Sequence, residues 1–152
     1  MTPARAALLV CAPIALIAST ASRPDRDAVR TFTVPLTGQA ETSPVQPEGG
    51  SGDPDGSGLV RLSVDPASRR LCYDFTLSGV ATPLMAHIHR GSELGNGPTV
   101  VTLFTGPGGE LRDCLDWTPK WLAAIIADPS GFYVNVATTE FPDGAVRGQL
   151  SG

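Results

Sequence analysis

The chain has 152 residues, a length that predicts a single domain with enough residues for a sizeable core. Its 17 glycines and 14 prolines disfavour long helices and favour short strands joined by turns. The formal net charge is −4, and the 11 Lys and Arg residues are scattered apart from Arg69 and Arg70, so the charge pattern argues against a nucleic-acid partner.

The N-terminus has the pattern of a secretory signal peptide. Arg5 supplies the positive charge, residues 6–18 are apolar, and residues 19–21 are small, as at a cleavage site. The apolar run is shorter than the roughly 20 residues of a membrane span. A buried N-terminal helix is the alternative, but the run has no amphipathic period and Pro13 interrupts it.

This pattern divides the chain into three parts. We expect residues 1–21 to be a signal peptide cleaved near Ala21, residues 22–30 to be a solvated leader, and residues 31–152 to be the folded domain. The mature protein would be secreted or held in the cell envelope, without a membrane span. Its partner would then be an extracellular protein or a cell-envelope component.

Two cysteines, Cys72 and Cys114, remain after Cys11 is lost with the signal peptide. Outside the cytosol an even number of cysteines favours a disulfide, worth roughly 4 kcal/mol for a loop of this length. Two free buried thiols are the alternative.

Alternating apolar residues predict three strands in the first half of the domain, at residues 31–37, 59–64 and 71–77. Pro35 indicates that the first of these lies at a sheet edge, because proline cannot donate to a ladder. Cys72 has the parity of the outer face, so the disulfide should attach a loop to the outside of the sheet.

Residues 38–58 form a long segment rich in Gly, Pro, Ser and acidic residues. A loop of this length is either flexible or in contact with a partner. Its final part, residues 53–58, resembles a calcium loop but lacks the full ligand set, so a solvated turn is expected there.

The second half of the domain contains four more predicted strands and one helix. Thr118 and Pro119 have the pattern of a helix start, and a helix of about ten residues should end at Asp128. The strands are expected around the two histidines and at residues 99–105, 132–138 and 145–150. Together these elements predict an all-β fold, a Greek-key β-sandwich or barrel of the immunoglobulin-like or superoxide-dismutase-like kind, with one short helix.

The two histidines of the chain lie on one predicted strand, where Met85, His87 and His89 share a face. Asn135 and Arg147 have the parity to lie on the same side of the sheet. We therefore expect a polar cluster of His87, His89, Asn135 and Arg147 that fixes the register between strands.

Four segments in order resemble the CHRD (chordin-type) domain family: TVPLTG at 33–38, AHIHRG at 86–91, GFYVNV at 131–136 and FPDGAVRGQL at 141–150. The resemblance covers residues 31–150. It implies an extracellular β-sandwich module of a family that includes growth-factor-binding chordins, while function follows only weakly from family membership.

The histidine strand is also similar to that of copper/zinc superoxide dismutases. Copper or zinc on Met85, His87 and His89 is thus the alternative to the structural role, although such sites use three or more protein ligands. Members of the CHRD family commonly have a further histidine where this chain has Ala137. The sequence has no nucleophile elbow and no phosphate-binding loop, so we expect a binding or structural module that is not an enzyme and needs no cofactor.

Overall fold

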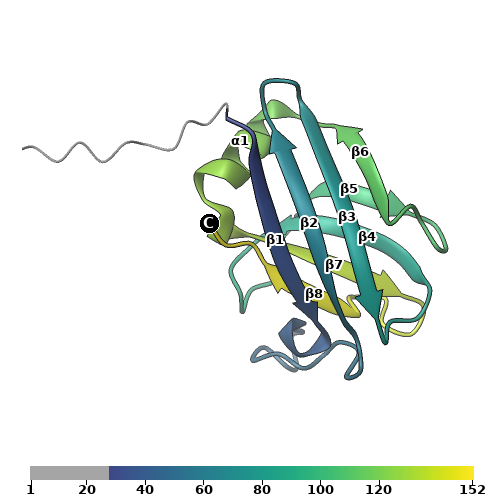
Figure 1. The fold of residues 1–152 in the computed structure, drawn as a ribbon. Coiled ribbons are helices and arrows are strands. Elements are labelled where there is room, and N and C mark those ends of the chain that lie inside the picture. The colour runs from purple at the N-terminus through teal and green to yellow at the C-terminus, as the bar shows by residue number, and fades with distance from the viewer. Residues whose placement is uncertain (1–27) are drawn as a thin grey trace, which may run out of the picture.

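The computed structural model describes residues 28–152, which form eight β-strands and one α-helix (Figure 1). The strands are β1 (Arg30–Thr37), β2 (Ser57–Asp65), β3 (Arg70–Ser78), β4 (Pro83–Arg90), β5 (Thr99–Thr105), β6 (Arg112–Asp116), β7 (Phe132–Thr138) and β8 (Val146–Gln149). The helix α1 spans Pro119–Ala127, and short 3-10 turns lie at Gly38–Ala40 and Pro129–Gly131. The predicted signal peptide and residues 22–27 lie outside the described residues.

All strand pairs are antiparallel, and the strands form one sheet in the order β5-β4-β7-β8-β1-β2-β3-β6. The sheet curls into a nearly closed barrel, with β1, β2 and β3 crossing in front of β4, β5 and β7 in Figure 1. The predicted fold class, an all-β sandwich or barrel with one short helix, is confirmed.

The barrel is open between β5 and β6, the two ends of the sheet order. Side chains bridge this gap. The indole N–H of Trp117 donates to the Val100 carbonyl at 2.8 Å, and the hydroxyl of Tyr73 donates to the Leu103 carbonyl at 3.1 Å. These bonds satisfy carbonyls of the β5 edge that would otherwise be available to another strand.

The inward residues of the strands form one continuous apolar core. Helix α1 contributes Leu122, Ile125 and Ile126 to this core. It begins after Thr118 with Pro119 in the first turn, although the Thr118 side chain makes no capping hydrogen bond. No helix within residues 28–152 combines the length and apolar character required to cross a membrane.

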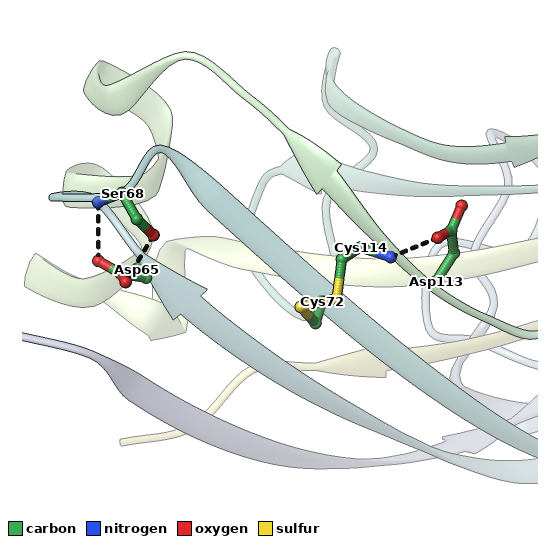
Figure 2. Close-up of a disulfide and its surroundings, with 5 residues drawn as sticks. All are labelled: Asp65, Ser68, Cys72, Asp113 and Cys114. Carbon is green, nitrogen blue, oxygen red and sulfur yellow. Dashed lines mark hydrogen bonds between the residues drawn. A yellow bond between two sulfur atoms is a disulfide. The ribbon is translucent and has the colours of Figure 1, made fainter.

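The predicted disulfide between Cys72 and Cys114 is present (Figure 2), but the expectation that it attaches a loop is wrong. Residues 112–116 form strand β6, and Cys72 and Cys114 are directly opposite each other in neighbouring strands. The Cys114 N–H donates to the Asp113 carboxylate at 2.7 Å, so it points away from β3. The cysteines therefore form a non-hydrogen-bonded pair, in which opposite residues approach most closely.

The expectation that Pro35 marks a sheet edge is also wrong, since β1 lies between β8 and β2. The pairing of β1 with β8 is confined to Thr37 opposite Arg147. Proline has no N–H to donate, and the side of β1 that faces β8 has almost no ladder of backbone hydrogen bonds. Pro35 can therefore occupy this strand without the loss of a ladder bond.

The long segment at 38–58 is more ordered than the predicted loop. It begins with the 3-10 turn at Gly38–Ala40, and its last two residues belong to β2. Its two ends are joined by a bond from the Gly38 N–H to the Gly56 carbonyl at 3.1 Å, and a bond from the Asp53 N–H to the Ala145 carbonyl at 2.8 Å holds it to the barrel. The segment therefore has a defined position beside the start of β8.

Candidate functional site

The outer face of β4 carries both histidines. Ala86 and Ile88 point into the core and are 0% exposed, whereas His87 and His89 lie on the opposite face, partly exposed. The two imidazole rings meet edge to face with 5.6 Å between their centroids. Burial, followed by the neighbouring His89, lowers the pKa of His87, so this ring is neutral at pH 7.

His89 is fixed by two contacts. Its ring is stacked on Tyr133 of β7 with 4.9 Å between centroids and 3° between planes. Its Nδ1 lies 2.9 Å from the carbonyl oxygen of Gly97. Since a carbonyl oxygen only accepts, Nδ1 carries the proton, and Nε2 of the neutral ring is an acceptor.

Arg147 of β8 is 1% exposed and organises the loops outside the barrel. Its Nη2 donates to the carbonyls of Ser92 and Gly95 at 2.7 and 2.9 Å, and its Nη1 donates to Thr42 Oγ1 and Asn96 Oδ1 at 3.1 and 3.0 Å. A planar guanidinium can make these bonds at once because its donors are arranged in a fixed fork. The side chain thus links the segment at 41–46 to the loop at 91–97.

Glu41 is also buried, at 3% exposed, beside the amide of Asn135. The Asn135 Nδ2 donates to Glu41 Oε1 at 3.2 Å and to the Asp143 carbonyl at 2.9 Å. Gly144 permits this packing, because a Cβ there would collide with the Glu41 carboxyl group and the Asn135 amide. Burial raises the pKa of Glu41 to about 7, against smaller lowering effects of the Asn135 hydrogen bond and Arg147.

These groups surround a cavity of about 360 Å³ that we call the loop cleft. It lies between the outer face of β4 and β7 and the segment at 41–44, and its lining includes Glu41, Thr42, His89, Tyr133, Asn135 and Asp143. A second hollow of about 400 Å³ shares Glu41 and Asp143 with it and extends to Val45. The cleft has the size of a small-molecule or side-chain site.

The four residues of the predicted polar cluster lie on the outer face of three adjacent strands, with His87 opposite Asn135 and Asn135 opposite Arg147. His89 and Arg147 contact the same ring, that of Tyr133. No hydrogen bond within residues 28–152 joins either histidine directly to Asn135 or Arg147. Tyr133 therefore connects His89 to Arg147, which do not contact each other through a hydrogen bond.

The residues of the alternative metal site share the outer face of β4, where Met85 is opposite Ala137 of β7. Within the part of the chain that the structure describes, no three His, Cys, Asp or Glu side chains lie close enough together to hold a metal ion. A metal on this face would depend on Met85 and the two imidazoles.

Sequence reasoning missed several residues of the cleft, notably Glu41, Thr42, Tyr133 and Asp143. Tyr133 could have been found, because it alternates with Val134 and Val136 and has the same parity as Asn135. Glu41 and Asp143 lie in irregular segments, where no period predicts which way a side chain points.

The comparisons with known proteins agree with this fold and these motifs. The model of the CHRD domain family matches residues 32–150, a range that includes all eight strands apart from the first two residues of β1. No curated protein and no solved structure matches this chain. Since the matched range is most of its length, the chain belongs to the CHRD domain family.

Proposed function

We propose that the protein is an extracellular binding module, without enzymatic activity, that recognises a protein or cell-envelope component through the surface around the loop cleft. This loop surface consists of residues 41–46, residues 92–97 and Asp143. The observation that carries the proposal is the anchoring of both loops by the buried Arg147. A preorganised surface loses little conformational entropy on binding, which favours recognition.

Exposed apolar side chains support this choice of surface. Val45 is 88% exposed and Leu94 is 64% exposed, and they lie on the two loops that Arg147 joins. The signal-peptide pattern and the family both favour an extracellular location for such a surface.

A photo-crosslinking residue at position 45 tests the proposal in the cells that export the protein. We expect a defined adduct at position 45 and none at position 59. Leu59 is the matched control, because it is also an exposed apolar residue, at 40% exposure, but lies on the outer face of β2, outside the loop surface. The same adducts at both positions, or none at position 45, would contradict recognition through the loop surface.

A further inference from the structure

The loop cleft contains hydrogen-bond acceptors that have no donors. His89 Nε2 is an acceptor because Nδ1 carries the proton toward Gly97, and Nε2 is buried without a partner within residues 28–152. An orphaned buried acceptor costs about 1–3 kcal/mol, so its presence beside a cavity calls for an explanation.

Asn135 adds to this surplus of acceptors. Both hydrogens of its Nδ2 are used, toward Glu41 and the Asp143 carbonyl, which leaves Oδ1 as an acceptor. The carboxyl groups of Glu41 and Asp143 line the same cleft. The salt bridge found in residues 28–152 joins Arg112 to Asp74, so neither of these carboxyl groups forms one, although Arg147 lies near enough to lower the pKa of Glu41.

The charged side chains that line the cleft and the two hollows beside it are acidic. A third hollow of about 250 Å³, which shares Thr42 with the cleft, is lined by Glu48 and Glu93. Of the ionisable groups that line the three hollows, four are acidic, the other two are His89 and Tyr133, and none is a lysine or arginine. Arg147 lies beneath them with the hydrogens of both Nη atoms already used.

We propose that the loop cleft binds the cationic end of a lysine or arginine side chain of the partner protein, while Val45 and Leu94 contact neighbouring apolar groups of that partner. An ammonium or guanidinium group has several donors and no acceptor, and so complements Asn135 Oδ1 and the two carboxyl groups that line the cleft, next to the buried His89 Nε2. The inference rests on the proposed function and names the partner's chemistry. An organic cation is favoured over a metal ion because the described residues hold no three-ligand group.

Glu41 gives this binding a dependence on pH. The groups that face it are Asp143 from the turn before β8, Arg147 of β8, and His89 and Tyr133 across the cleft. With a pKa of about 7 in the free protein, Glu41 is largely protonated at pH 6. A bound cation lowers this pKa, so binding at pH 6 releases a proton, and affinity rises between pH 5.5 and pH 8.

Calorimetric titration of the mature protein with hexalysine tests the inference, with fully acetylated hexalysine and hexaglutamate as control peptides. We expect hexalysine alone to bind. Glu41→Gln should weaken binding at pH 8 at least about tenfold, and Asp116→Asn less than about twofold, although both remove one negative charge. Asp116 is exposed at the far end of β6, so it controls for net charge.

Titration at pH 6 in two buffers of different ionisation enthalpy measures the released proton, which should be absent in Glu41→Gln. Equal weakening by the two variants, or binding of hexaglutamate, would overturn the cation site. A cross-link at position 45 without hexalysine binding would overturn the cation site alone. Hexalysine binding without that cross-link would contradict the proposed function instead.

Discussion

The Cζ atom of Arg147 lies 3.5 Å from the centroid of the Tyr133 ring. A guanidinium over an aromatic face gains up to about 2 kcal/mol when the pair is desolvated, and both residues here are almost fully buried. This contact fixes the plane of the guanidinium, and the plane decides which loop atoms its donors reach. The outer faces of β7 and β8 thereby set the position of the loops that pack on them.

Replacement of Arg147 should therefore release the loop surface. We expect Arg147→Ala to lower the free energy of unfolding by about 3 kcal/mol, because buried carbonyls lose their donors. Arg147→Lys should recover only part of this loss, since an ammonium cannot reproduce the fork. Arg61→Ala, an exposed control, should change stability by less than about 0.5 kcal/mol.

Denaturant unfolding measures these changes, and amide hydrogen exchange locates them. Faster exchange in Arg147→Ala should be concentrated in residues 41–46 and 91–97. Uniformly faster exchange across the barrel would contradict a role in anchoring the loops.

The cysteine pair provides a second prediction. Mass spectrometry of the purified, unreduced protein should show Cys72 linked to Cys114, which are 42 residues apart in sequence. Replacement of both by serine should cost roughly 4 kcal/mol on the chain-entropy model, and reduction of the wild type should cost a similar amount. Thiol labelling of the unreduced protein that finds both Cys72 and Cys114 free would disprove the bond.

The barrel was largely predictable because its strands alternate. Val60, Leu62 and Val64 point inward on β2, as their period of two indicates. Strand β6 could not be predicted in this way, because RDCLD has polar residues on both faces and is a strand through its pairing with β3. The prediction of a sheet edge at Pro35 was wrong for a related reason. Whether β1 has a neighbour on its second side depends on where β8 lies in three dimensions, which the local sequence does not indicate.

The candidate site was predictable only in part. Parity placed His87, His89, Asn135 and Arg147 on one side of the sheet, and they do lie there. The position of Glu41 beside Asn135 depends on a contact between residues 94 positions apart. Local pattern carries no information about such a contact, so the cleft became visible only in three dimensions.

The alternative metal site can be tested directly. We expect protein purified without an affinity tag to hold no stoichiometric copper or zinc, because the described residues supply no three-ligand group of the usual type. His87→Ala/His89→Ala should then bind added copper as weakly as the wild type does. A stoichiometric ion in the parent, lost in the double variant, would establish a metal centre on β4 and contradict the proposed function.

The protonation of Glu41 predicts how stability depends on pH. Folding raises its pKa from 4.5 to about 7, so the folded state binds more protons than the unfolded state between these values. The contribution of Glu41 to stability therefore falls as pH rises from 4.5 to 7, by up to about 3 kcal/mol. Glu41→Gln keeps an acceptor for Asn135 but cannot ionise, so it should match the wild type near pH 4 and be more stable at pH 8. Glu48→Gln, at an exposed position, should leave the profile unchanged. Urea unfolding from pH 4 to pH 8 measures the difference, and parallel profiles for wild type and Glu41→Gln would show that Glu41 is not protonated in the folded protein at neutral pH.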